Sequence, residues 1–220
     1  MEIIKYSNIG CREINQDCLA SLSFDHDKSI HIVADGIGGY DCGEIASKIV
    51  CESYIHGLVN NLSIDEVTKE VSKNIQTECR TLGVSKMGSA VAAVFLNGLQ
   101  ASIFSAGDSR VYVFRDKHLL YQTEDHSLLN ELSRIRELSF DEKKRYKHII
   151  TRSIMGNADD KVDHDNLELC FGDEILICTD GMYNEYPIDY LIESIRMDKL
   201  DIEKKNDSFM DNHSFIYILL

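Results

Sequence analysis

Ser29–Ser47 reads SIHIVADGIGGYDCGEIAS, and this stretch decides the fold around it. Residues 30–34 form an apolar run typical of a buried β-strand, which ends in Asp35 and Gly36. Further glycines follow, and then apolar residues recur every three or four positions, which predicts a helix over 43–59. A carboxylate beside a glycine carbonyl suits a hard cation with oxygen ligands. An ordinary turn uses the same residues, so this stretch alone does not prove a site.

The same pattern returns three more times, at Asp108, Asp180 and Asp211, always beside small or turn-forming residues. We expect Asp180 to end a strand and Asp211 to precede the last strand. If these strand ends converge, the clustered carboxylates must bind cations or take up protons. An all-oxygen ligand set favours Mg²⁺ or Mn²⁺ over zinc. Four independent turns are the alternative, and the repeated placement favours the site.

Arg12 and Asp17 belong to a polar loop near the start of the chain, CREINQD at 11–17. A guanidinium near a metal cluster can hold a phosphate group through two hydrogen bonds, which lysine does less well. The alternative for one arginine in a surface loop is a solvated charge, and spacing alone does not decide between the two.

Composition limits the class of protein. The 220 residues suit one domain, 1–220, and the formal charge of −14 argues against binding nucleic acid through its phosphates. The seven cysteines are odd in number and scattered, which is typical of reduced thiols in a cytoplasmic protein. We see no signal peptide, and no apolar run approaches the roughly 20 residues of a membrane helix.

The remaining chain predicts an α+β fold of antiparallel sheets with helical layers. Ser63 and Glu66 form a capping box before a helix over 64–80, and Asn97-Gly98 between two β-rich runs predicts a hairpin. Short turns between consecutive strands imply antiparallel pairing, and the helices fall into groups. The charged stretch 133–157 predicts a surface flap.

Eight motifs, in this order, resemble the metal-dependent protein phosphatases of type 2C in their compact bacterial form. They span nearly the whole chain: GCREINQD (10–17), VADGIGG with GEIAS (33–47), GSAVAAVFL (88–96), AGDSRVYVFR (106–115), TEDHSLLNEL (123–132), ITRSIMG (150–156), GDEILICTDGMY (172–183) and DNHSFIYIL (211–219). The resemblance implies a four-layer αββα sandwich of two antiparallel sheets, with a metal site at one rim.

The resemblance also implies a ligand set for two Mn²⁺ or Mg²⁺ ions. Asp35 would bridge them, with the Gly36 carbonyl on one ion, and Asp180 and Asp211 would complete the other. Asp108 resembles the family residue that shares a third, weaker ion with the position of Asp180.

The resemblance assigns two further roles, so that Arg12, Asp17 and Asp35 form the implied catalytic set. Arg12 matches the phosphate-binding arginine, and Asp17 matches the carboxylate that orders metal-bound water. The implied reaction is hydrolysis of phosphoserine and phosphothreonine in proteins, by attack of a water activated by the two metals. The implied partners are phosphorylated proteins and a cognate serine/threonine kinase. The acidic balance of the chain is an argument for basic phosphopeptides.

Departures from the family pattern keep other functions open. Gln16 stands where the family has a glutamate, and the stretch Tyr183–Asp211 is short, which would fit a weakly active or inactive binding or regulatory module. Retention of the aspartates argues against such a module. A metal-dependent phosphohydrolase acting on small molecules is a third reading, with the same metal chemistry and a different pocket.

Overall fold

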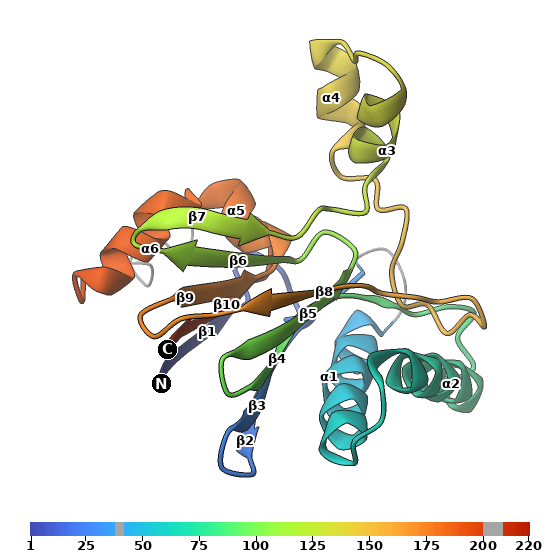
Figure 1. Cartoon of the computed structure of the whole chain (residues 1–220). Coiled ribbons are helices and arrows are strands. Elements are labelled where there is room, and N and C mark those ends of the chain that lie inside the picture. Colours follow the sequence, from blue (N-terminus) through green and yellow to red (C-terminus); the bar gives the residue numbers. More distant parts are fainter. Residues whose placement is uncertain (38–41, 200–208) are drawn as a thin grey trace.

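In the computed structural model, two antiparallel sheets face each other between two groups of helices (Figure 1). Residues 1–37, 42–199 and 209–220 are described. Residues 38–41 of the 33–47 motif and part of the short stretch before Asp211 therefore lie outside the described residues.

Each sheet has five strands among the described residues. The first sheet, in spatial order, contains β1 (Glu2–Asn8), β10 (His213–Leu219), β9 (Glu174–Cys178), β6 (Arg110–Arg115) and β7 (His118–Gln122). The second sheet contains β2 (Asp17–Phe24), β3 (Lys28–Gly36), β4 (Ser89–Asn97), β5 (Gln100–Ala106) and β8 (Asp163–Glu168). All of the pairings are antiparallel, as the short connections predicted.

Three apolar clusters hold the layers together. The inner faces of the two sheets meet through β-branched and small side chains such as Val33, Val94, Val113, Ile177 and Ile216. The outer face of the second sheet is covered by α1 (Gly43–Val59) and α2 (Ile64–Leu82). The outer face of the first is covered by α5 (Asp180–Glu185) and α6 (Ile188–Arg196). The predicted αββα sandwich is thus confirmed.

Local sequence signals set several boundaries. The Ser63 hydroxyl accepts a hydrogen bond from the Glu66 amide while the Glu66 carboxylate accepts one from the Ser63 amide, so α2 begins with the predicted capping box. The hairpin at Asn97-Gly98 is also present, because Asn97 pairs with Gln100 across a two-residue loop. Gly98 has a φ of +59°, which glycine adopts at little cost.

Some elements differ from the sequence prediction. The sequence indicates a strand only at 168–169, whereas β8 covers Asp163–Glu168; its sequence DHDNLE is polar because it forms an exposed edge of the sheet. Asp180 was expected to end a strand, but β9 ends at Cys178 and Asp180 is the first residue of α5. Residues 125–137 look helical in sequence, but the helix covers only Leu128–Ile135, and Ser127 caps its start.

Helices α3 (Leu128–Ile135) and α4 (Phe140–Tyr146) project from the rest of the molecule (Figure 1). Neither helix contains a buried residue, whereas each of the other helices does. All of α4 and the last turn of α3 fall within the stretch 133–157 that the sequence predicts as a flap. No helix in the described ranges is both long and apolar enough to cross a bilayer.

Candidate metal centre

The predicted site lies at one rim of the sandwich. Neighbouring antiparallel strands run in opposite directions, so at this rim the end of one strand lies beside the start of the next. Asp17 opens β2 directly opposite Asp35 at the end of β3. In the other sheet, Cys178 at the end of β9 pairs with Arg110 at the start of β6 and with Phe215 near the start of β10. The loops that carry the remaining aspartates therefore leave the two sheets at this same edge.

A cavity of about 410 Å³ opens at this rim. Its lining includes six of the seven predicted site residues: Arg12, Asp35, Gly36, Asp108, Asp180 and Asp211. Asp17 is not part of the lining and lies beside Asp35 in the sheet. The structure thus brings together residues separated by up to 199 positions in the chain.

Asp17 and Asp35 form a pair of carboxylates on neighbouring strands, an arrangement that is unfavourable without a cation. Burial, assisted by the charges of Asp180 and Asp211, raises the pKa of Asp17 to about 7. The Thr179 hydroxyl donates to Asp17 Oδ2 at 3.1 Å, while Oδ1 is buried without a hydrogen-bond partner. Burial and the neighbouring carboxylates, Asp17 first, raise the pKa of Asp35 well above its usual value.

Asp108 is held in the β5–β6 connection by a stacked network behind it. The Tyr183 hydroxyl donates to the Asp108 carbonyl at 2.9 Å, and the Arg110 guanidinium lies 3.7 Å from the centre of the Tyr183 ring. Asp125 accepts two hydrogen bonds from Arg110, at 2.6 and 2.7 Å. Asp125 therefore has a structural role. Burial, and then the charge of Asp180, raises the pKa of Asp108 to about 7.

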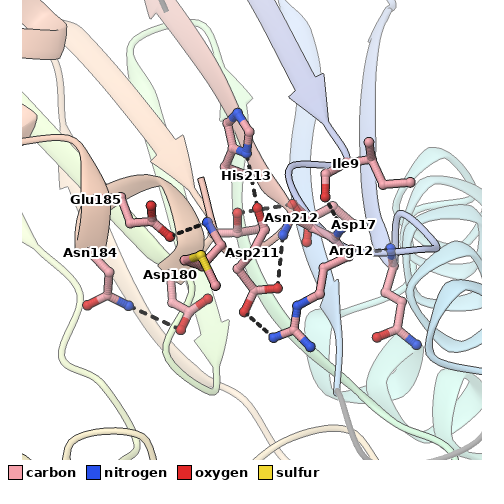
Figure 2. Close-up of polar contacts among 12 residues, drawn as sticks. Ile9, Arg12, Asp17, Asp180, Asn184, Glu185, Asp211, Asn212 and His213 are labelled. Carbon is pink, nitrogen blue, oxygen red and sulfur yellow. Dashed lines mark hydrogen bonds and ion pairs between the residues drawn. The ribbon is translucent and has the colours of Figure 1, made fainter. Parts of the chain in front are cut away.

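Asp180 and Asp211 face the cavity from the other sheet (Figure 2). Asn184, one turn along α5, donates to Asp180 at 3.2 Å. Arg12 donates to Asp211 at 2.8 Å, and the Arg12 side chain is 53% exposed, so its other donors face solvent. Burial and the charge of Asp211 raise the pKa of Asp180.

Asn212 positions the loop that carries Arg12, a role that the sequence analysis missed. Its side-chain NH₂ group donates to the backbone carbonyls of Ile9 and Ile14, and its Oδ1 accepts from the backbone N–H of Gln16 (Figure 2). These bonds tie the 9–16 loop to the start of β10. An asparagine next to an aspartate reads as a turn in sequence, so only the long-range contacts reveal its role.

Gly36 is required by close backbone contact. A Cβ atom at this position would lie 2.3 Å from the carbonyl oxygen of Gly43, so any side chain would push the strand away from the start of α1. Gly181 is similar, because its Cβ would lie 2.0 Å from the Asn212 carbonyl oxygen. Both glycines keep the backbone close to the cavity.

The donor set of the cavity fits hard divalent cations. Burial and neighbouring carboxylates raise the pKa values of Asp35, Asp108 and Asp180, which line the cavity, and of Asp17, which lies beside Asp35 outside the lining and has an unpartnered Oδ1. Such a cluster is stabilised by positive charge. Among the described residues, no group of three or more acidic, histidine or cysteine side chains is arranged so that it could hold an ion as placed. Arg12 instead supplies positive charge to Asp211.

His148 and Ile150 also line the cavity, and the sequence analysis did not single them out. They follow α4 in the chain, so a segment that leaves the sandwich returns to its rim. No local motif signals this return, because it depends on how the projecting helices join the body.

Comparison with known proteins gives a consistent result. The family model for protein phosphatase 2C matches residues 6–208. A putative protein phosphatase 2C-type from Streptococcus pyogenes is 31% identical over 225 residues, covering 96% of this chain and 90% of that protein. The serine/threonine phosphatase stp of Listeria monocytogenes is 29% identical, covering 90% of this chain and 84% of that protein.

Solved structures agree with the fold. The serine/threonine phosphatase of Streptococcus agalactiae is 26% identical with a TM-score of 0.78, and the match covers 100% of this chain and 99% of that one. PstP of Mycobacterium tuberculosis has a TM-score of 0.84 at 22% identity, over 100% and 98% of the two chains. A catalytic domain of PstP crystallised with two manganese ions has a TM-score of 0.81 at 21% identity, over 98% and 96%. From the sandwich, its acidic rim and the match over residues 6–208, we conclude that this chain belongs to the protein phosphatase 2C family.

Proposed function

We propose that this protein is a metal-dependent serine/threonine protein phosphatase that hydrolyses phosphoserine and phosphothreonine in proteins. The observation that carries the proposal is the convergence of Asp35, Asp108, Asp180 and Asp211 on one cavity with Arg12 at its edge. The relatives of this chain include proteins named as serine/threonine or protein phosphatases, which supports the same class of enzyme here.

Asp35, Asp180, Asp211 and the Gly36 carbonyl are the residues that would hold two Mn²⁺ or Mg²⁺ ions, and Asp108 with Asp180 would hold a third. When bound, these ions supply a Lewis acid that lowers the pKa of water and neutralises phosphate charge. The chain places the carboxylates through the elements beside them: Asp35 lies in β3, Asp180 begins α5, and Asp108 and Asp211 lie in the connections just before β6 and β10.

Arg12 is the phosphate-binding group in this proposal. Its guanidinium has five N–H donors, of which one contacts Asp211 in the structure. The exposed donors can hold two phosphate oxygens side by side, which orients phosphorus for attack from the opposite side. Asp17 contributes the unpartnered Oδ1 as an acceptor that orders water.

The test is hydrolysis of a phosphothreonine peptide and of an aryl phosphate, with Mn²⁺ and with excess chelator. We expect turnover that requires the metal and is lost in Asp35→Asn. Full activity in both Asp35→Asn and Asp180→Asn would reject the assignment.

A weakly active or regulatory phosphatase fold is the second candidate, and the ion pair between Arg12 and Asp211 is the observation that favours it. In that case Arg12 would stay on Asp211, and Mn²⁺ would bind weakly without producing turnover. Calorimetric titration with Mn²⁺, run beside the activity assay, separates the two functions.

The proposal extends to the setting of the enzyme. Its substrates would include the products of a cognate serine/threonine kinase in the cytoplasm, and the scattered thiols Cys18, Cys51, Cys79, Cys170 and Cys178 support a reducing compartment. Phosphoproteomic comparison of cells with and without the gene would identify the phosphosites that accumulate in its absence.

A further inference from the structure

The α3–α4 projection, defined here as residues 128–148, differs in charge from the rest of the chain. The projection contains six lysines and arginines and four acidic residues, whereas the whole chain has 23 and 37. The projection extends away from the sandwich (Figure 1), and neither of its two helices contains a buried residue. A basic segment is thus attached to an acidic protein.

Most of this positive charge is not used within the molecule. Arg134 pairs with Glu124 and Arg136 pairs with Glu142. Four further cations have no carboxylate within ion-pair distance among the described residues, and all four are exposed: Lys143, Lys144, Arg145 and Lys147. They sit in the last turn of α4 and directly after it.

This end of α4 leads into the candidate metal centre. Lys147 is followed by His148, and both His148 and Ile150 line the metal-centre cavity. A second cavity of about 660 Å³ lies beside the first and shares Ile37, His148 and Ile150 with it. A phosphorylated residue in the first cavity would place its neighbours in the second, whose lining residue His148 directly follows the basic end of α4 in the chain.

Resting on the function proposed above, we propose that the basic end of α4 and the adjacent cavity bind acidic residues that flank the phosphorylated residue of a protein substrate. The enzyme would therefore prefer phosphosites with neighbouring aspartate or glutamate. This differs from the preference for basic peptides that the net charge of the chain suggests. The charge close to the bound peptide determines the peptide preference, because charges more than about 8 Å apart are largely screened at physiological ionic strength.

A purely structural role for these lysines is the competing explanation. Cations in the last turn of a helix interact favourably with its dipole. That role affects the stability of α4, and it does not distinguish an acidic peptide from a basic one. The measured quantity is therefore the ratio of kcat/KM for the two peptides, which cancels a general loss of active enzyme.

The experiment uses the whole chain with Mn²⁺ and two phosphothreonine peptides of equal length. One peptide carries glutamates on both sides of the phosphothreonine, and the other carries lysines. Peptide binding is measured in parallel by fluorescence anisotropy, and aryl phosphate hydrolysis reports on the metal centre alone. We expect the wild-type protein to prefer the acidic peptide by about tenfold in kcat/KM, because each exposed charge pair contributes modestly.

The variant Lys143→Glu/Lys147→Glu reverses two charges one helical turn apart. We expect it to lose the preference for the acidic peptide, while Lys143→Arg/Lys147→Arg keeps it. The matched control is Lys69→Glu/Lys73→Glu, which makes the same change with the same spacing on α2. The control should keep the wild-type ratio. If circular dichroism shows that the reversed variant loses helix, Lys143→Gln/Lys147→Gln replaces it.

The outcomes separate this inference from the proposed function. Aryl phosphate turnover with equal or basic peptide preference would overturn the inference and leave the function standing. The same ratio in the α4 variant and the α2 control would also overturn it. Absence of all turnover, with acid-selective binding that depends on Lys143 and Lys147, would reject the function and support the inference.

Discussion

The two ends of the β9 strand carry buried acidic residues in opposite surroundings. Before β9 and at its start, Asp173 and Glu174 each meet an arginine: Asp173 accepts from Arg115 at 2.8 and 2.9 Å, and Glu174 is bonded by Arg196. Beyond its other end, Asp180 faces Asp211 and other carboxylates. The acidic residues at the first end are paired with arginines of the protein, whereas those at the second end are the ligands that we propose for cations.

The pKa directions follow this difference. The bond from Arg115 lowers the pKa of Asp173, and the bonds from Arg196 and Tyr217 outweigh burial to lower the pKa of Glu174. At the rim, burial and like charges raise the pKa of Asp180. Buried carboxylates with internal partners stabilise the fold, whereas unpaired ones cost stability and mark a site that binds charge.

The largest expected effect concerns activity at the rim. Asp35→Asn and Asp180→Asn should each lower kcat by at least about 100-fold, because even residues that only support metal ligands typically change activity by 10–100-fold. Steady-state hydrolysis of a phosphothreonine peptide with Mn²⁺ measures the loss. The control is Asp25→Asn in the turn between β2 and β3, where asparagine suits the φ of +52°. A loss in the control equal to that in Asp35→Asn would contradict the comparison.

His31 on β3 is a buried base, and its pKa can be compared with those of the acids at the two ends of β9. His31 lies between the hydroxyls of Ser21 and Ser29, and burial, assisted by the charge of Lys5, lowers the pKa of His31 to about 4. In the unfolded chain the pKa of His31 is about 6.5, so below that pH the unfolded chain binds a proton that the folded chain does not bind. The free energy of unfolding is therefore unaffected by His31 above pH 6.5 and decreases as the pH falls toward 4. The loss amounts to roughly 3 kcal/mol.

Urea unfolding of the wild-type protein and His31→Gln across pH 4–7 isolates this contribution, because the difference between them removes the titration of the carboxylates. The difference should narrow as the pH falls. A difference that stays constant over this range would show that His31 does not change its protonation on unfolding.

Metal binding should stabilise the rim without affecting the other end of β9. Mn²⁺ at 100 times its dissociation constant should raise the free energy of unfolding by about 2.7 kcal/mol, because it binds the folded chain only. Thermal unfolding with and without chelator measures the shift. We expect it to disappear in Asp35→Asn and to persist in Glu174→Gln. An equal shift in both variants would place the ions elsewhere.

The smallest expected effect is at the paired end. Glu174→Gln should destabilise the fold by about 2 kcal/mol, because Arg196 loses a charged partner and the Tyr217 hydroxyl loses a strong acceptor. Activity relative to the folded fraction should be retained. Glu168→Gln on the exposed edge strand β8 is the control, with a change within about 0.5 kcal/mol. Equal stability of the Glu174→Gln and Glu168→Gln variants would contradict a structural role for Glu174.

Sequence signals predicted the elements that depend on neighbouring residues. The capping box of Ser63 and Glu66 begins α2 as expected, and the apolar run before Asp35 forms the centre of β3. Strand β8 escaped notice because an exposed edge strand needs few apolar residues, and α5 because its six residues follow a strand directly. Short or exposed elements leave weak patterns in sequence.

The sequence alone determined the chemistry of this protein: which residues carry charge, where locally signalled elements such as β3 and α2 lie, and which motifs match a metal-dependent phosphatase. Only the tertiary structure decided which groups meet. It set Asp17 opposite Asp35, bonded Arg12 to Asp211, tied the 9–16 loop to Asn212 and brought the end of α4 to the cavity. The physical reason is that these contacts depend on sheet register and on packing between distant segments, and periodicity and spacing encode only the local backbone.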